Sequence, residues 1–225
     1  MVAFPFRVVG FDLDGTLLDT SGDLANAVNH ALASAGRAAL PVARIRTMIG
    51  GGSRHMLQQG MEATGGCTEA ELDVLQRRLL DFYEANIAVE TRPFPGLIDA
   101  LDRLDAMGVV LGVMTNKYER LARVVLDALN LTRRFACVIG GDTLPVGKPD
   151  PAPIRLMVER CGGGDSGGRA AFVGDSIFDV RAGQAAGLPV VACSFGFLQS
   201  PVEDLGADAV IDGFDELIPA LERLG

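Results

Sequence analysis

The sequence predicts an α/β protein in which a parallel sheet flanked by helices carries an inserted all-helical segment. Short continuous apolar runs alternate along the chain with segments whose apolar residues recur at the helical period. Such alternation indicates parallel strands joined by crossover helices. One long stretch without a convincing strand interrupts this rhythm early in the chain.

The expected strands are short, and most lack polar alternation, which is typical of strands covered on both faces. In chain order they are Phe6–Asp12, Val109–Thr115, Cys137–Gly141, Ala170–Asp175, Val190–Phe195 and the weaker Ala209–Ile211. Helices are expected at Leu97–Met107 and Tyr118–Leu129, where apolar residues follow a period of about 3.6. Together these segments predict an open, Rossmann-like core.

The interrupting segment, from about Asp19 to Thr91, is expected to form three or four helices. They are placed at about Leu24–Ala35, Val42–Ile49, Ser53–Ala63 and Glu69–Ala88. We therefore expect a core of residues 1–18 and 92–225 and a helical domain of residues 19–91. The chain would cross between them twice, near Leu18–Gly22 and Glu90–Phe94, and two adjacent crossings make a plausible hinge.

Composition and charge narrow the classes of function. The 225 residues are 48% hydrophobic and 22% charged, which suits a globular chain with a sizeable core. The net charge of −9 gives no overall attraction for nucleic acid or an anionic membrane. For the same reason, an anionic substrate must be held by local cations or by a metal.

Cysteine usage and hydropathy point to the cytoplasm. The four cysteines show no CxxC spacing, so we expect free thiols in a reducing compartment rather than a zinc site. The chain shows no signal peptide and no apolar run near the ~18 residues of a membrane span. The glycine-rich stretch Cys161–Arg169 lacks the GK[ST] ending of a phosphate-binding loop and is expected to be a connection.

The first candidate site residues are Asp12 and Asp14, in FDLDGTLLDT directly after the first strand. Carboxylates at i and i+2 share one side of an extended chain, and Gly15 permits a tight turn close to a ligand. A strand-ending turn would explain the same residues without function. An EF-hand loop also begins with DxD, but Thr16 and Leu17 do not fit its fifth and sixth positions.

A second acidic pair, Asp175 and Asp179, stands in FVGDSIFDV after a later strand. If a helix begins at Ser176, the two carboxylates lie one turn apart on the same face. A helix N-cap at Asp175 or Ser176 would account for one acid, but not for a second acid facing the same way.

Polar residues follow two further strands. Thr115 and Asn116 end VVLGVMTN, where they suit phosphate oxygens and a helix N-cap equally well. Lys148 stands in VGKPDP, where the flanking prolines would stiffen its loop and favour a placed cation over a solvated one. Because the carboxyl ends of parallel strands meet at one edge, these residues and the four acids should share one crevice. Oxygen ligands of this kind suit Mg²⁺, and carboxylates, Mg²⁺ and a lysine can together stabilise a transferring phosphoryl group.

In their order and separations, the motifs DLDGT, MTN, GKPDP and GDSIFD resemble those of the haloacid dehalogenase-like hydrolase superfamily. The helical insert is similar to that superfamily's cap domain. The stretches TRPFPGLIDALDRL, TNKYERLARVVLDALNL and GGDTLPVGKPDP look most like bacterial phosphoglycolate phosphatases. The resemblance therefore implies a phosphatase acting on a small phosphorylated metabolite, as a monomer or homodimer.

The resemblance also implies residue roles. Asp12 would be the nucleophile and Asp14 the acid and base. Thr115 and the Asn116 backbone would hold phosphate, and Lys148 would neutralise charge. The remaining implied roles concern Mg²⁺, which would be held by the Asp12 side chain, the Asp14 carbonyl and Asp175, with Asp179 acting directly or through water.

Within the insert, IGGGSRHML places Arg54 where related enzymes select substrate. Arg54 is expected either to bind a second anionic group in a bidentate contact or to be an ordinary surface arginine.

Other functions stay open at this point. A β-phosphoglucomutase-like phosphosugar mutase would return the phosphoryl group to a sugar phosphate, and a sugar-phosphate phosphatase or pyrophosphatase would differ only in substrate. A non-catalytic binding module would need neither Asp12 nor Asp14, and a dehalogenase would need no Mg²⁺ and no acid at position 14.

Overall fold

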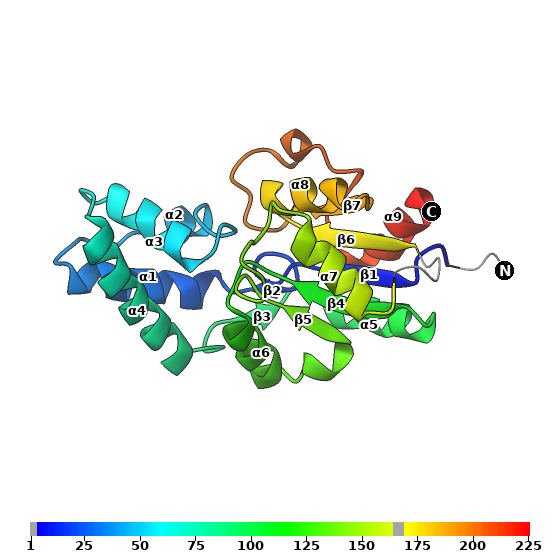
Figure 1. Ribbon diagram of the computed structural model, residues 1–225, viewed down its shortest axis with the longest axis horizontal. Helices are drawn as coiled ribbons and strands as arrows, with labels where there is room; N and C mark the ends of the chain where they lie inside the picture. The colour runs from blue at the N-terminus through cyan, green and yellow to red at the C-terminus, as the bar shows by residue number, and fades with distance from the viewer. Residues whose placement is uncertain (1–3, 164–168) are drawn as a thin grey trace.

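The computed structural model describes residues 4–163 and 169–225. Within these ranges, six parallel strands form one sheet in the order β5-β4-β1-β6-β7-β8 (Figure 1). The strands are β1 (Val8–Phe11), β4 (Val110–Met114), β5 (Cys137–Ile139), β6 (Ala170–Gly174), β7 (Val190–Cys193) and β8 (Ala209–Ile211). The predicted α/β class and all six predicted strands are therefore confirmed, although most strands are shorter than expected.

Helices cover both faces of the sheet. The clusters of buried residues place one group of helices on one face: α5 (Leu97–Ala106), α6 (Glu119–Ala128) and α9 (Leu217–Leu224). They place the other group on the opposite face: α7 (Ala152–Arg160) and α8 (Ile177–Ala185). Single 3-10 turns complete the connections: η1 (Thr132–Arg134), η2 (Val202–Leu205) and η3 (Phe214–Glu216).

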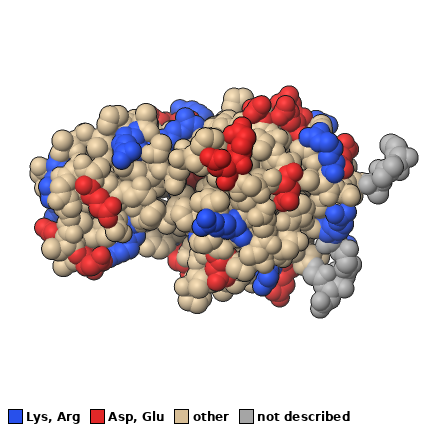
Figure 2. All heavy atoms as spheres, turned by 90° about the horizontal axis from the view of Figure 1, so that it is seen from above, with Lys and Arg blue, Asp and Glu red and all other residues tan. Residues whose placement is uncertain are grey.

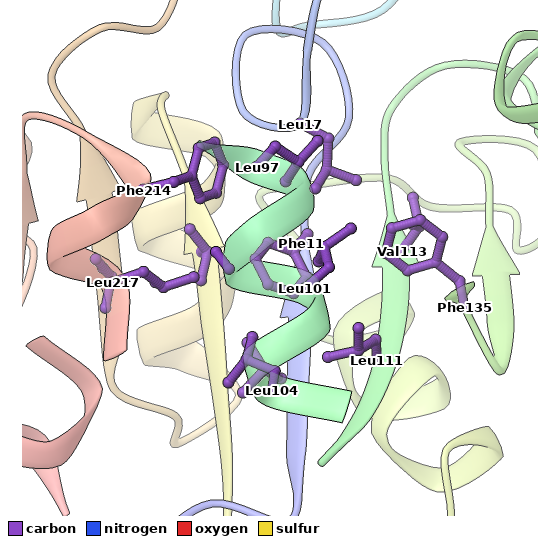
Figure 3. Packing of buried hydrophobic residues seen from close by; sticks show 14 of the residues in the cluster. Phe11, Leu17, Leu97, Leu101, Leu104, Leu111, Val113, Phe135, Phe214 and Leu217 are labelled. Atoms are coloured by element: carbon purple, nitrogen blue, oxygen red, sulfur yellow. The ribbon is translucent and has the colours of Figure 1, made fainter. Parts of the chain in front are cut away.

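The main core lies between the apolar face of α5 and the sheet. In α5, Leu97, Leu101 and Leu104 lie on one face of the helix and are fully buried. They pack in one cluster with Phe11 of β1 and Val113 of β4 (Figure 3). All four residues of β1 are buried because helices cover the sheet on both sides, so the strand is rigid up to the point where Asp12 leaves it.

A helical insert follows β1 and lies apart from the sheet (Figure 1). Its helices are α1 (Ser21–Ser34), α2 (Val42–Arg46), α3 (Ser53–Glu62) and α4 (Glu69–Ala85). They enclose a second core, in which α1 and α4 pack most extensively against each other. The predicted all-helical insert is confirmed, and its described residues form these four helices.

The two chain crossings lie side by side. They form a short antiparallel pair that the sequence did not predict, β2 (Leu18–Asp19) with β3 (Arg92–Pro93). The buried Asp23 carboxylate ties the crossings together, because it accepts hydrogen bonds from the Thr91 amide at 3.0 Å and the Thr91 hydroxyl at 2.7 Å. We propose that this pair marks the boundary between the core and the insert.

Surface charge is spread rather than concentrated. On the face shown in Figure 2, acidic and basic side chains are interspersed over both the insert and the core. None of the helices in residues 4–163 and 169–225 combines the length and apolar character needed to cross a bilayer. Most of the glycine-rich connection predicted at Cys161–Arg169 falls outside the described residues.

Candidate active site

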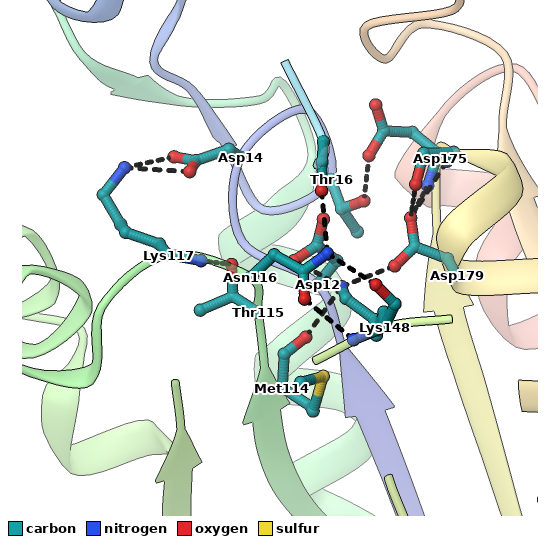
Figure 4. Close-up of polar contacts among 12 residues, drawn as sticks. Asp12, Asp14, Thr16, Met114, Thr115, Asn116, Lys117, Lys148, Asp175 and Asp179 are labelled. Atoms are coloured by element: carbon teal, nitrogen blue, oxygen red, sulfur yellow. Dashed lines mark hydrogen bonds and ion pairs between the residues drawn. The ribbon is translucent and has the colours of Figure 1, made fainter. Parts of the chain in front are cut away.

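The predicted core residues meet at the carboxyl edge of the sheet, facing the insert. Asp12 follows β1, Thr115 follows β4, Asp175 follows β6, and Asp179 lies in the first turn of α8 (Figure 4). Lys148 reaches the same place from the loop after β5. The expectation that residues at the carboxyl ends of parallel strands meet at one edge, here called the strand-end rule, therefore holds for residues more than 160 positions apart in the chain.

Three buried carboxylates form a compact acidic group. Asp12, Asp175 and Asp179 each offer an oxygen, and these oxygens all lie within 4.8 Å of one another. Asp12 Oδ1 is buried and lies 2.8 Å from Lys148 Nζ, with which it forms an ion pair. Lys148 is shared with Asp179, so one ammonium group faces two of the three buried carboxylates, which is costly unless a further cation offsets the remaining charge.

Burial perturbs these groups. It raises the pKa of Asp12 to about 6, against the opposing charge of Lys148, and the Asp179 carboxylate adds to the rise. Burial and the Asp179 and Asp12 carboxylates together raise the pKa of Asp175 well above its ordinary value. Burial alone would lower the pKa of Lys148, but the Asp12 and Asp179 carboxylates outweigh it and raise that pKa.

Asp175 is enclosed by backbone on two sides. Its Oδ1 accepts from the Thr16 hydroxyl at 2.9 Å and its Oδ2 from the Phe197 amide at 2.6 Å. A Cβ on Gly15 would stand 2.3 Å from Asp175 Oδ2, and one on Gly196 would stand 2.2 Å from Asp175 Cβ. Both glycines are therefore needed for the approach, and Gly15 also has a φ of +89° that side chains rarely adopt.

Asp179 serves the fold as well as the site. Its Oδ2 accepts from the Ser176 amide at 2.9 Å and the Ser176 hydroxyl at 2.5 Å, which closes a capping box at the start of α8. Its Oδ1 accepts from Lys148 Nζ at 2.5 Å. The helix-cap interpretation is therefore confirmed, with Ser176 and Asp179 forming the cap together.

The donor set fits a hard divalent cation. The site holds three carboxylates whose oxygens lie within 4.8 Å of one another and a backbone cradle around Asp175. Among the described residues, the cations paired with the acids of the site are Lys117, which meets Asp14, and Lys148, which meets Asp12 and Asp179. A divalent ion would offset the excess negative charge.

The Asn116 side chain makes contacts that the sequence analysis did not predict. Its Nδ2 donates to the carbonyl oxygens of Gly50 and Lys148, both at 3.0 Å, and its Oδ1 accepts from the Lys148 amide at 2.8 Å. The side chain therefore connects the insert to the lysine loop. Thr115 is buried, and its hydroxyl accepts from the Lys117 amide at 3.3 Å.

Of the two alternatives expected for Arg54, the structure matches that of a surface arginine. Its guanidinium donates to Glu69 at 2.5 Å and to Asp73 at 2.6 Å, on the exposed side of the insert. It does not line the pocket above Asp12 and Asp14, whereas its neighbours Gly52 and Ser53 do. The loop before Arg54 therefore faces the pocket, whereas Arg54 itself is paired with two carboxylates of α4.

Lys117, Tyr83 and Thr16 were missed by sequence reasoning. Lys117 Nζ lies 2.8 Å from both oxygens of Asp14 and 4.6 Å from the centre of the Tyr83 ring. The sequence could have indicated Lys117, because it directly follows Thr115 and Asn116 and so continues the polar residues at the end of a predicted strand. Tyr83 gave none, since it continues the apolar stripe of α4.

Comparison with known proteins places the chain in a family. The sequence matches the haloacid dehalogenase-like hydrolase family over residues 6–187. It is 43% identical to a protein of Caulobacter vibrioides named phosphoglycolate phosphatase, covering 92% of this chain and 86% of the relative. A protein of Mesorhizobium japonicum with the same name is 42% identical, and 96% of each chain is covered.

The fold comparison agrees. A crystal structure described as a predicted phosphoglycolate phosphatase from Haemophilus somnus superposes with a TM-score of 0.88 at 30% identity, covering 96% of this chain and 97% of the other. The motifs, the site geometry and these similarities converge, and the chain belongs to the haloacid dehalogenase-like hydrolase family.

Proposed function

We propose that the protein is a Mg²⁺-dependent phosphomonoester hydrolase whose substrate is 2-phosphoglycolate, which it converts to glycolate and phosphate. The observation that carries the proposal is the group of three buried carboxylates, Asp12, Asp175 and Asp179, whose oxygens lie within 4.8 Å of one another, with Lys148 paired to two of them. The names of the two similar proteins, both matched over nearly the whole chain, support the choice of substrate.

Asp12 is the nucleophile in this proposal. Its carboxylate oxygen forms a bond to phosphorus while the bond from phosphorus to the ester oxygen breaks, giving an aspartyl phosphate. Asp14 gives a proton to the departing oxygen, so that glycolate leaves with its hydroxyl group restored. Asp14 then takes a proton from water as the water oxygen attacks phosphorus, which releases phosphate and regenerates Asp12.

The surrounding residues hold the phosphoryl group and balance its charge. The Thr115 side chain and the backbone amide of Asn116 bind phosphate oxygens, and both residues line the pocket with Asp12 and Asp14. Lys148, fixed by Asp12 and Asp179, offsets the charge that develops on the phosphoryl oxygens.

The Asp12 side chain, the Asp14 carbonyl and Asp175 would hold Mg²⁺, with Asp179 directing Lys148. Bound there, the ion supplies positive charge to the phosphoryl oxygens.

The first test is phosphate release from a panel of phosphomonoesters, with Mg²⁺ and with a chelator. We expect 2-phosphoglycolate to be preferred and the chelator to abolish turnover. A preference for sugar phosphates would contradict the substrate but keep the phosphatase, whereas isomerised sugar phosphate without free phosphate would indicate a mutase. Lack of Mg²⁺-dependent turnover on every ester would leave a binding module.

Asp14→Asn separates the roles of the two aspartates. Because the Asp14 side chain acts on protons and only its carbonyl would meet the ion, we expect Mg²⁺ binding close to that of the wild type, measured by calorimetry. Turnover should fall at least about 100-fold, since a positioned acid and base contributes that much or more. Equal losses of binding and turnover would contradict the assignment.

A further inference from the structure

The pocket between the core and the insert contains a buried cation that the phosphoryl chemistry above does not use. This pocket has a volume of about 520 Å³, including its open mouth. Asp12, Asp14 and Thr115 line its core side, and apolar residues such as Leu24, Met56 and Leu79 line much of the insert side. Of the described residues that line it, Lys117 alone is cationic.

Lys117 is held over Asp14 with little access to water. Its side chain is 6% exposed, and its Nζ is 2.8 Å from each Asp14 oxygen. The ammonium group of Lys117 is thus held in place by an ion pair with the Asp14 carboxylate. One carboxylate satisfies only part of its capacity, because an ammonium group has three donors.

Tyr83 supplies a second polar atom at the same place. Its ring lies against Lys117 and it is 2% exposed. Its buried hydroxyl makes no hydrogen bond of good geometry among the described residues, although the Lys117 ammonium group lies close enough to interact with it. A buried hydroxyl normally makes such a hydrogen bond, and the lack of one requires an explanation. Because Tyr83 lines the pocket, a ligand in the pocket can supply that hydrogen bond.

We propose that Lys117 and the Tyr83 hydroxyl bind the carboxylate of the substrate and thereby select short phosphate esters that carry an acid group. This inference rests on the proposed function, because it assigns the part of 2-phosphoglycolate that the phosphoryl site does not touch. In that molecule a single methylene separates the ester oxygen from the carboxylate carbon. An ester oxygen that faces Asp14 therefore brings the carboxylate next to the ammonium group bound to Asp14.

The arrangement also accounts for the position of Arg54. A contact between a second anionic group and Arg54 was one of the two alternatives, but Arg54 is paired with Glu69 and Asp73 outside the pocket. Lys117 comes instead from the core, directly after the phosphate-binding Thr115 and Asn116. The distance between the phosphoryl and carboxylate sites is then set within one rigid strand end, while the insert contributes Tyr83 when it covers the pocket.

The test compares 2-phosphoglycolate with ethyl phosphate, a two-carbon ester that lacks the carboxylate. For Tyr83→Phe we expect the ratio of the two kcat/KM values to fall about tenfold, the usual effect of removing a hydrogen bond to a charged group. For Lys117→Gln we expect a fall of about 100-fold, since a buried ionic contact is lost. The matched control is Tyr118→Phe, because the Tyr118 hydroxyl already accepts from Gln76 at 3.2 Å, and its ratio should stay unchanged.

A second measurement covers the case in which Lys117→Gln fails to fold. Glycolate, which carries the carboxylate without the phosphoryl group, should inhibit ethyl phosphate hydrolysis by the wild type about tenfold more strongly than by Tyr83→Phe. If Lys117 only positions Asp14, its loss will lower kcat for both esters equally, and that result would overturn the inference.

The two proposals fail in distinguishable ways. If the wild type does not prefer 2-phosphoglycolate to ethyl phosphate, the proposed substrate is wrong and this inference falls with it. If the wild type shows the preference but Tyr83→Phe and Lys117→Gln both keep it, the substrate stands and only the carboxylate site is wrong.

Discussion

Thr16 offers a direct test of how the acidic site is held together. Its side chain is fully buried, and its hydroxyl donates to Asp175 Oδ1 at 2.9 Å. Replacing Thr16 with valine keeps the shape and removes the donor. The Phe197 amide would then be the remaining donor to the Asp175 carboxylate from the described residues. We therefore expect Thr16→Val to affect both stability and metal affinity.

The magnitude follows from the contact that is lost. A hydrogen bond to a charged acceptor contributes about 1.5–3 kcal/mol. For a chain of this size, each kcal/mol lowers the melting temperature by about 2–4 °C, so we expect Thr16→Val to melt about 3–12 °C lower in the presence of Mg²⁺. Loss of a group that orients a metal ligand typically weakens binding about 10–100-fold, and we expect the lower part of that range.

The assay is a Mg²⁺ titration of phosphate release together with thermal unfolding. Thr16→Ser is the matched control, because serine keeps the hydroxyl and loses only a methyl group. The serine variant should bind Mg²⁺ within about threefold of the wild type, since its carboxylate contact is retained. If the valine and serine variants shift the Mg²⁺ requirement equally, packing of the methyl group rather than the hydrogen bond supports the site.

Two further predictions concern charge and the contact between insert and core. The pKa of Asp12 rises from 3.8 to about 6 mainly through burial. Because an acid with a raised folded-state pKa ionises more readily in the unfolded chain, the metal-free protein should lose about 3 kcal/mol of stability from this group as pH rises from about 4 to about 6. When the free energy of unfolding is measured in a chelator across this pH range, it should fall less steeply for Asp12→Asn than for the wild type. Parallel curves for the two proteins would contradict the raised pKa of Asp12. Arg46 of α2 donates to the carbonyl oxygens of Phe195 at 2.9 Å and Gly196 at 3.1 Å, and it lies over the Phe197 ring. Arg46→Met should therefore make the backbone amide of Phe197 exchange with solvent about tenfold faster. Arg44→Met, which replaces an exposed arginine of the same helix, is the control and should leave this exchange rate unchanged. Equal exchange rates in the two variants would show that Arg46 does not hold the loop that contains Phe197.

Sequence reasoning located most of the site because the strand-end rule converts local signals into spatial ones. Apolar runs marked the strands, and the polar residues that end them had to meet at one edge of a parallel sheet. Asp12, Thr115 and Asp175 followed from this rule, and Lys148 followed from its stiff loop. Helices α7 and α9 and the β2–β3 pair were not predicted, because short segments carry too little periodicity to distinguish them from loops.

Contacts between distant side chains lay beyond the reach of the sequence. The sequence determined that the chain is an α/β protein with a helical insert and that its carboxylates gather at one edge, because periodicity and turn chemistry are local properties. Only the tertiary structure decided that Lys117 meets Asp14, that the Tyr83 hydroxyl makes no hydrogen bond of good geometry among the described residues and that Arg54 is already paired. Those outcomes depend on how the insert docks on the core and on which rotamers close packing allows, and no local pattern encodes that geometry.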